Sequence, residues 1–171
     1  MIENMLDNPL IKIELEMDFF KIKDKIKYDF LIYTGKLDEF FNYKYGKLPY
    51  RSLKFEFRTL EIEYFQEVAQ VNYPENYDFT RITEFKHFRP LMNNKKTVIS
   101  FEYPQEYREA ENEPYYPIPS EETEKILGKY KELACDIQNT IFIGRLAEYR
   151  YYNMDQIVAR ALKTFEKYFL R

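Results

Sequence analysis

Glycine is scarce in this sequence of 171 residues. The four glycines, Gly35, Gly46, Gly128 and Gly144, are well separated along the chain. The sequence therefore contains neither G-x-G-x-x-G nor G-x-x-x-x-G-K-S/T, two loops whose clustered glycines let backbone N–H groups approach phosphates closely. The chain alone cannot form a complete Rossmann-type dinucleotide fold or a P-loop nucleotide site.

Cysteine and histidine are equally scarce, with one residue of each. Cys135 alone excludes an intrachain disulfide and a cysteine-only metal site, and a single thiol is typical of a protein from a reducing compartment. His87 alone excludes a histidine-rich zinc centre. We therefore expect no bound metal.

The sequence also lacks an excess of positive charge and long hydrophobic runs. Its 26 basic and 29 acidic residues give a net charge of −3, which disfavours a nucleic-acid partner, because phosphate neutralisation needs a basic surface. No apolar run approaches the roughly 18 residues of a membrane span. The first twenty residues are acidic and lack the pattern of a signal peptide. We expect a cytoplasmic protein without a membrane span.

Aromatic residues are abundant, with 17 tyrosines and 15 phenylalanines. A hydrophobic fraction of 45% indicates a globular chain. Alternating apolar and polar residues predict consecutive strands at 52–65, 68–73, 80–88 and 97–103, which short turns would join into an antiparallel meander. Shorter strands are predicted at residues 11–15, 28–34 and 140–143.

The sequence predicts helices at three places: after the strand at residues 28–34, after residue 119 and in the last twenty residues. Residues 38–45 form a short aromatic pattern that ends at Gly46. Ser120 precedes two glutamates and an apolar stripe, as expected of an N-cap. Asn153 and Gln156 have the spacing of a capping box before the last helix. Strands and helices in this order predict an α+β fold.

The segment IFIGRLAEYRYYNMDQ combines a strand, a glycine, two arginines and a helix start. A helix N-terminus offers free N–H groups and a partial positive charge, and Arg145 and Arg150 add guanidinium donors for phosphate or carboxylate. The pattern predicts an anion site. The alternative is that both arginines form surface ion pairs with glutamates, which are common.

The same segment, GRLAEYRYYNMDQ, resembles the C-terminal flavin- and substrate-contacting segment of UDP-galactopyranose mutases. Four further blocks resemble that family in the family's order, and MIENML resembles the interior of a family helix. The blocks are YTGKLDEFFNYKYGKLPYRSLKFE (33–56), VAQVNYPENYDFTRITEFKHF (68–88), TVISFEYPQEY (97–107) and EPYYPIP (113–119). The resemblance covers only the C-terminal portion of the family, and the glycine-rich FAD-binding half has no counterpart.

The resemblance implies an isomerase that interconverts UDP-galactopyranose and UDP-galactofuranose, a precursor of cell wall polysaccharide. The family uses reduced FAD as a covalent catalyst, while the protein supplies positioning and electrostatics. We expect this chain alone to retain no FAD and to be inactive. It would need a separate N-terminal FAD-binding chain or would self-associate through uncovered apolar faces.

The resemblance also implies roles for individual residues. Arg81 and Arg145 match catalytic arginines, Arg81 at the substrate diphosphate and Arg145 near both sugar and flavin. Tyr116 and Tyr151 match tyrosines whose hydroxyls contact the diphosphate, and Asn153 lies beside them at the substrate. The residues expected at the cofactor are Gly144, Arg145, Tyr151, Met154, Asp155 and Gln156.

Three residues need separate comment. Asn153 stands where many bacterial members have Asp; it can cap a helix but cannot act as a base. His87 could be a general base, although a structural role on its strand is the favoured interpretation. Cys135 is expected to be a small, half-buried thiol near a helix end.

The resemblance divides the chain into three parts. Residues 1–34 would belong to the FAD domain, 35–119 would form the largely antiparallel sheet of the substrate region, and 120–171 would complete the FAD domain with a strand–helix unit. Two other functions stay open: a non-catalytic UDP-sugar-binding or partner-docking module, and another FAD-linked oxidoreductase.

Overall fold

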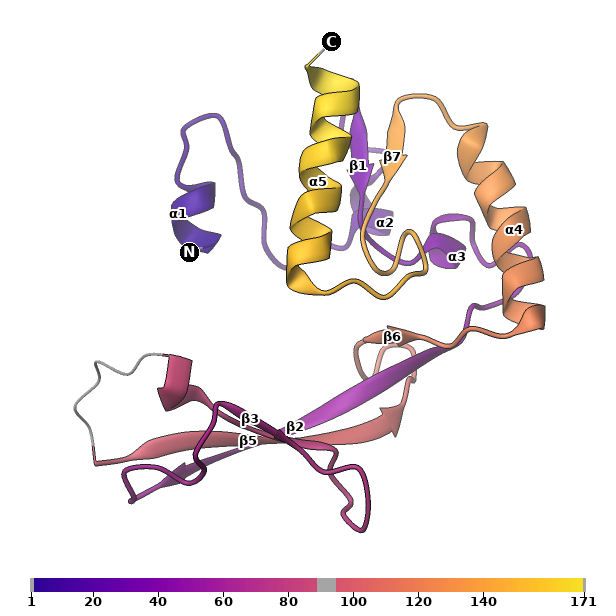
Figure 1. Ribbon diagram of the computed structural model, residues 1–171. Coiled ribbons are helices and arrows are strands. Elements are labelled where there is room, and N and C mark those ends of the chain that lie inside the picture. Colours follow the sequence, from indigo (N-terminus) through magenta and orange to yellow (C-terminus); the bar gives the residue numbers. More distant parts are fainter. Residues whose placement is uncertain (1, 89–94, 171) are drawn as a thin grey trace. The chain divides into compact units, whose positions relative to one another are not determined.

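The computed structural model describes residues 2–88 and 95–170 (Figure 1). Contacts within the chain define two compact units, Met1–Leu31 and Ile32–Arg171. The α+β fold class is confirmed. The assignment of residues 1–34, 35–119 and 120–171 to parts of a flavoenzyme stays a prediction.

The first unit contains two short helices, α1 (Ile2–Leu6) and α2 (Phe19–Ile22). Asp18 caps α2, because its side chain accepts the N–H of Phe20 at 2.9 Å. The strand predicted at residues 11–15 is wrong, since that segment has no regular structure and its side chains are exposed. Alternation alone does not make a strand, which needs a neighbouring strand for its backbone groups.

A parallel pair of strands consists of β1 (Leu31–Tyr33), which begins at the last residue of the first unit, and β7 (Thr140–Phe142). The helices α3 (Leu37–Phe40) and α4 (Glu121–Cys135) contribute buried side chains to the core beside this pair. The fully buried members of this core are Leu37, Leu48, Tyr50, Leu127, Tyr130 and Tyr149. Tyr130 crosslinks it, because its hydroxyl donates to the Gly46 carbonyl at 2.8 Å.

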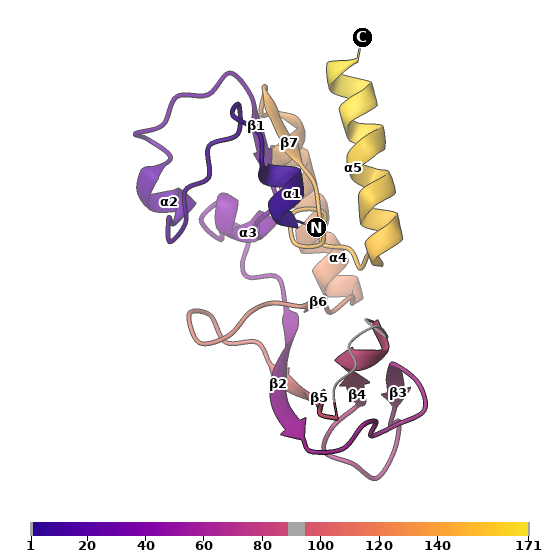
Figure 2. The same ribbon diagram turned by 90° about the vertical axis from the view of Figure 1, so that its left-hand side faces the viewer.

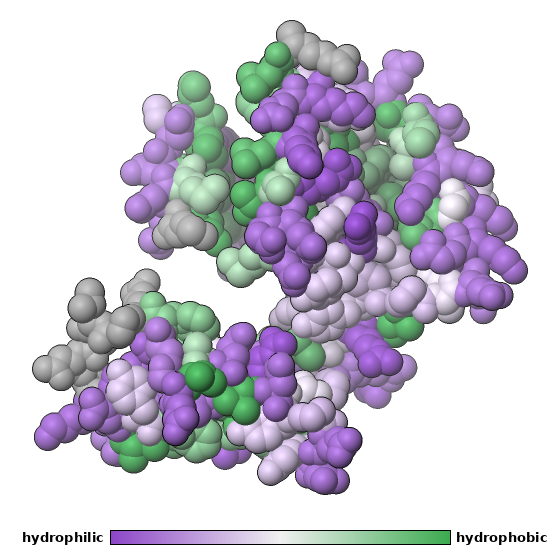
Figure 3. All heavy atoms as spheres, in the orientation of Figure 1, coloured by the Kyte–Doolittle hydropathy of each residue, from purple (hydrophilic) through white to green (hydrophobic). Residues whose placement is uncertain are grey.

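Both predicted N-caps are present. The Ser120 hydroxyl accepts the Thr123 N–H at 3.1 Å at the start of α4. The last helix, α5 (Met154–Phe169), begins with the Asn153–Gln156 capping box, in which Gln156 Oε1 accepts the Asn153 N–H at 2.9 Å. Hydrophobic side chains run along the exposed side of α5 (Figure 3). They are Val158, Leu162, Phe165, Tyr168 and Phe169.

The remaining strands form one sheet in the order β3-β4-β5-β2-β6. Every pairing in it is antiparallel. Its strands are β2 (Tyr50–Leu60), β3 (Gln70–Asn72), β4 (Arg81–Glu84), β5 (Thr97–Glu106) and β6 (Tyr116–Pro117). The predicted meander order is wrong, because β2 pairs with β5 and not with β3 (Figure 2). The two longest strands thereby pair along residues 51–60 and 97–106, which satisfies the most backbone groups.

The strand predicted at residues 80–88 ends at Glu84 and continues as a 3₁₀ helix, η1 (Phe85–Phe88). Glu84 is completely buried, and its carboxylate accepts the N–H groups of Phe65 and Gln66 at 3.0 and 2.9 Å. These two hydrogen bonds hold the segment after β2, which contains Phe65 and Gln66, against the end of β4. His87 consequently leaves the strand and does not share a strand face with Arg81.

A buried lysine ties the α3 region to the loop after β5. The Lys36 ammonium donates to the Tyr107 hydroxyl at 2.9 Å and to the Tyr43 hydroxyl at 3.2 Å. Glu109 accepts from Lys36 at 3.2 Å and from Lys47 at 2.5 Å. Burial opposes the charge on Lys36, but these hydrogen bonds raise its pKa above the ordinary value. Hydrogen bonds from Lys47, and then from Tyr43, lower the pKa of Glu109 to about 2.

Glu109→Gln is expected to lower the free energy of unfolding at pH 7 by about 1 kcal/mol, a modest value because the carboxylate is partly exposed. A depressed carboxyl pKa stabilises the folded state above the unfolded-state pKa, and this stabilisation is lost as the pH falls from about 4.5 towards about 2. Urea unfolding at pH 7 and at pH 3 tests this. The variant should lose less stability on acidification than the unsubstituted chain; an equal loss would contradict the prediction.

Candidate active site

The loop between β7 and α5 holds Arg145 in one orientation. Gly144 has φ of +107°, a conformation that favours glycine, and its N–H donates to Glu148 Oε2 at 3.0 Å. The Arg145 guanidinium donates through Nε and Nη2 to the Tyr152 carbonyl, at 2.9 and 2.6 Å. A backbone carbonyl thus fixes the Arg145 side chain, and the alternative of a glutamate ion pair does not describe it.

Two tyrosines from separate parts of the chain lie against this guanidinium. The Arg145 guanidinium carbon is 4.6 Å from the Tyr151 ring centre and 5.8 Å from that of Tyr116. The two rings stack with their centres 5.7 Å apart. Tyr116 belongs to β6 and Tyr151 to the loop before α5, so folding joins three of the predicted site residues.

Arg81 lies on β4, directly opposite Glu102 on β5. Its Nη1 is 3.6 Å from Glu102 Oε2, and its Nε donates to Asn72 Oδ1 at 2.9 Å. Glu102 is buried, with 8% of its surface exposed. Sequence reasoning missed Glu102, although the alternation around it is clear, because the strand register that places it opposite Arg81 is not visible in the sequence.

The pKa of the Tyr116 hydroxyl depends on its burial and on the charges of both arginines. Burial raises the pKa of Tyr116, and the charges of Tyr151 and Glu102 raise it further. The guanidinium groups of Arg81 and Arg145 act in the opposite direction on the same group. By contact, however, Tyr116 meets Arg145 and Tyr151, whereas the Arg81 side chain pairs with Glu102 and Asn72.

The start of α5 borders the same group of side chains. The Tyr151 hydroxyl donates to Asn153 Oδ1 at 3.0 Å. Met154 is 77% exposed, and Asp155 and Gln156 are also exposed in this first turn. The first N–H groups of a helix have no partner within the helix, so this end can accept an anion once a ligand reaches it. Arg150 does not join the site, because its guanidinium lies over the Tyr152 ring instead.

The donor set is suited to anions. It comprises the Arg145 guanidinium, two tyrosine hydroxyls and a helix N-terminus, and such groups bind phosphate oxygens and stabilise delocalised negative charge. A diphosphate and a reduced flavin, the two groups that the family resemblance implies, fit this chemistry. Among the residues that the structure describes, no cluster of three or more His, Cys, Asp or Glu could hold a metal ion.

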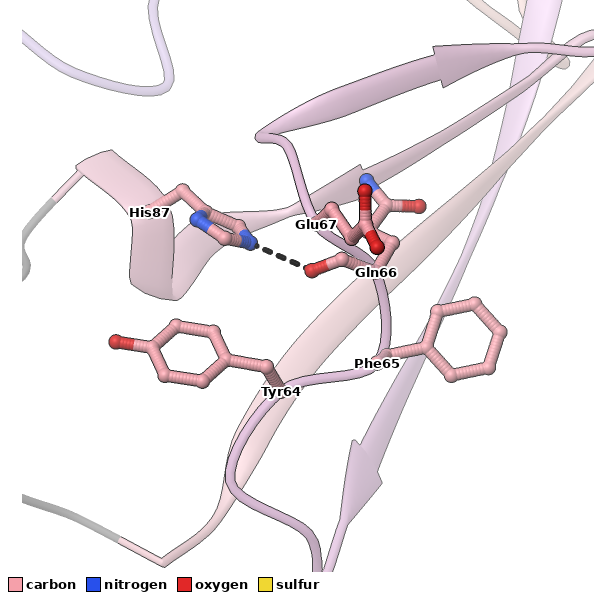
Figure 4. A pocket seen from close by; sticks show the side chains of 5 residues that line it. All are labelled: Tyr64, Phe65, Gln66, Glu67 and His87. Carbon is pink, nitrogen blue, oxygen red and sulfur yellow. Dashed lines mark hydrogen bonds between the residues drawn. The ribbon is translucent and has the colours of Figure 1, made fainter.

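A hollow of about 500 Å³ lies beside His87 (Figure 4). It is lined by Tyr64, Phe65, Gln66, Glu67 and His87. His87 Nε2 is 2.9 Å from the Gln66 carbonyl and 3.3 Å from Glu84 Oε2, so both acceptors require a proton on this nitrogen. The contacts support the structural interpretation of His87 over a general base.

Two further observations bear on the sequence predictions. Cys135 is exposed at the end of α4, so the expectation of a half-buried thiol is wrong. Its position on the helix, one residue before the C-cap Asp136, accounts for this exposure. Within residues 2–88 and 95–170, no helix has the length and apolar character needed to cross a bilayer.

Comparison with known proteins identifies the family. The family model described as UDP-galactopyranose mutase matches residues 1–151. A probable UDP-galactopyranose mutase from Klebsiella pneumoniae is 40% identical over 98% of this chain and 43% of its own length. A dTDP-fucopyranose mutase from Escherichia coli is 33% identical over 97% of this chain and 45% of its own length. A UDP-galactopyranose mutase from Mycoplasma genitalium is 33% identical over 93% of this chain and 43% of its own length. The chain spans less than half the length of these relatives, and it belongs to the UDP-galactopyranose mutase family.

Proposed function

We propose that this chain supplies the diphosphate-binding and flavin-contacting part of a mutase that interconverts UDP-galactopyranose and UDP-galactofuranose. The observation that carries the proposal is the Arg145 guanidinium, fixed by the Tyr152 carbonyl against the stacked rings of Tyr116 and Tyr151. The positive charge of Arg81 opposes the rise in the pKa of Tyr116 that burial causes. The relatives named above act, by their names, on sugars attached to nucleoside diphosphates, which carry the anion that these residues suit.

The cofactor of the proposed reaction is FAD, which in its reduced form supplies the nucleophile when bound. The residues that would contact it are Gly144, Arg145, Tyr151, Met154, Asp155 and Gln156. Arg145 would place a fixed positive charge beside the reduced ring, and the helix N-terminus would add a partial one. Because the Arg145 side chain is already oriented, little reorganisation is needed when negative charge arrives.

The remaining residues of the site hold the substrate. Arg81 would bind diphosphate oxygens and stabilise the charge that develops on the departing UDP. The raised pKa of Tyr116 keeps its hydroxyl protonated near neutral pH, so it can donate a hydrogen bond to the same oxygens. Asn153 accepts from the Tyr151 hydroxyl and orients that ring, a role that needs no charge.

The wider setting of this function is also a proposal. Residues 1–34 and 120–171 would complete an FAD domain, whose glycine-rich part would come from an N-terminal FAD-binding segment or a separate chain. Residues 35–119 would form the substrate region. The product would serve cell wall polysaccharide synthesis in the cytoplasm.

A second candidate is a non-catalytic module that binds UDP-sugars. One observation favours it: Arg81, Glu102, Tyr116, Arg145 and Tyr151 all lie in the unit Ile32–Arg171, so a nucleotide-sugar could be held without another chain.

Purification from FAD-rich medium separates these possibilities. We expect the isolated chain to show no stoichiometric flavin absorbance, because the glycine-rich pyrophosphate loop is absent from this sequence. Calorimetry with UDP should show weak binding that Arg81→Ala abolishes. A stoichiometric yellow protein would contradict the expectation, and an absence of UDP binding would exclude the independent module.

A further inference from the structure

The candidate site is built from two separate segments of the chain. Arg145 and Tyr151 belong to the loop between β7 and α5, whereas Tyr116 belongs to β6. The two tyrosine rings stack, but stacked rings occur over a range of centre separations of roughly 4.5–7 Å, so a stack alone does not fix two segments relative to each other. A directional contact between the loop and the strand is needed for that.

The Tyr149 hydroxyl supplies such a contact. Tyr149 belongs to the same loop as Arg145, and it is 6% exposed. Its hydroxyl accepts the Ile118 N–H at 3.1 Å and donates to the Pro49 carbonyl, and the Ile118 carbonyl lies 3.1 Å away as a second acceptor. Pro49 precedes β2 and Ile118 follows β6, so one hydroxyl joins the loop to the end that these two paired strands share.

The backbone of the loop connects this contact to Arg145. The Glu148 N–H donates to the Gly144 carbonyl at 2.9 Å, and the Arg150 N–H donates to the Arg145 carbonyl at 3.0 Å. Tyr149 lies between these donors with φ of +49°, in the left-handed region. A residue other than glycine keeps this conformation only where its surroundings enforce it. The turn that carries Arg145 and the anchored Tyr149 side chain therefore hold each other in place.

A second contact between the same segments is weaker. The Tyr50 hydroxyl is 3.5 Å from the Leu146 carbonyl, which is long for a hydrogen bond. The rings of Tyr50 and Tyr149 pack edge to face with their centres 5.2 Å apart. Burial raises the pKa of Tyr149 to about 12, so its hydroxyl keeps its proton near neutral pH. Of these contacts, the hydrogen bonds of Tyr149 are the shorter and more directional ones.

We propose that Tyr149 is a positioning residue of the mutase site, whose hydroxyl holds the loop at the distance from β6 at which Tyr116 and Tyr151 bind one diphosphate together. This inference rests on the proposed function, which assigns both tyrosine hydroxyls to the diphosphate. Tyr149 itself would touch neither substrate nor flavin. The orientation of Arg145 would depend less on Tyr149, because the Tyr152 carbonyl fixes that guanidinium within the loop.

Hydrogen exchange of the full chain tests the contact without any ligand. In Tyr149→Phe, the backbone amides of residues 144–152 and 115–118 should exchange about tenfold faster than in the unsubstituted chain, because the hydrogen bonds that join these two segments are lost. The amides within α4 should not change. Equal exchange of both segments in the variant and the unsubstituted chain would overturn the inference.

Tyr130→Phe is the matched control. The Tyr130 hydroxyl is also buried in this unit, accepts the Tyr45 N–H at 2.9 Å and donates to the Gly46 carbonyl at 2.8 Å. It joins α4 to the turn after α3, away from the two segments of the site. Its removal should leave the exchange of residues 144–152 and 115–118 unchanged. Acceleration of these segments by both variants would indicate a general loosening of the core and overturn the positioning role.

Binding of UDP distinguishes a positioning role from a purely structural one. In calorimetry with the full chain, Tyr149→Phe should raise the UDP dissociation constant about tenfold, whereas Tyr130→Phe should leave it unchanged. A Tyr149→Phe chain that binds UDP as tightly as the unsubstituted chain would overturn the positioning role and leave the proposed function intact. An unsubstituted chain that binds no UDP would remove the diphosphate assignment itself, and the inference would fall with it.

Discussion

Replacing Glu84 by alanine is expected to lower the free energy of unfolding by about 3–5 kcal/mol. The Glu84 carboxylate is completely buried and accepts the N–H groups of Phe65 and Gln66. It also accepts the Thr97 hydroxyl at 2.5 Å, and His87 Nε2 lies 3.3 Å away. Removal of the carboxylate would leave several donors without an acceptor in a place that water does not reach.

Urea unfolding followed by circular dichroism measures this effect, since the chain has no tryptophan to report on it. Glu67→Ala is the matched control, because Glu67 is an exposed glutamate of the same segment and its replacement should change stability by less than about 0.5 kcal/mol.

Burial alone would raise the pKa of Glu84, but hydrogen bonds from Thr97, Phe65 and Gln66 lower it. The stabilisation should therefore fade on acidification below the ordinary carboxyl pKa. Equal unfolding midpoints for the two variants would show that the hydrogen bonds from Phe65 and Gln66 to Glu84 do not stabilise the fold.

The largest effect on activity is expected for Arg145. A chimera in which this chain replaces the matching part of the Klebsiella pneumoniae relative should convert UDP-galactofuranose to UDP-galactopyranose. In it, Arg145→Ala should lower kcat/KM by about 10²–10³-fold, the usual cost of removing one preorganised donor at a developing charge. Arg145→Lys should also be impaired, because an ammonium cannot reproduce the paired bonds to the Tyr152 carbonyl.

Arg108→Ala is the control for Arg145, since Arg108 forms only exposed ion pairs with Glu106 and Glu111. It should leave the activity of the chimera unchanged. Retention of full activity by Arg145→Ala would contradict the proposed role of the guanidinium. An inactive chimera that Asn153→Asp restores would show instead that the proposed neutral role of Asn153 is wrong.

Features that depend on a few neighbouring residues could be predicted from the sequence. The caps at Ser120 and Asn153 are present because each involves hydrogen bonds within three residues. The strand at 97–103 is present within β5, whose alternating side chains face two different surfaces. Three of the residues predicted for the site, Tyr116, Arg145 and Tyr151, lie together, while Arg81 pairs with Glu102.

Features that depend on distant partners could not. The segment 11–15 alternates as well as β2 does, yet it remains without regular structure because it has no strand beside it. The meander order was wrong because sequence proximity does not measure how many backbone bonds two strands can form. β5 pairs with β2 along residues 51–60 and 97–106, and that gain places β2 between β5 and the two-residue strand β6.

The composition and local patterns of this chain determine its class, its helix ends, its family and the residue types at its site. Three features follow from the tertiary structure alone: the buried Glu102 opposite Arg81, the hydrogen bonds to the buried Glu84, and the pairing of β2 with β5. Each depends on strand register or burial. These are set by the sum of contacts between residues far apart in the sequence, which no local pattern records.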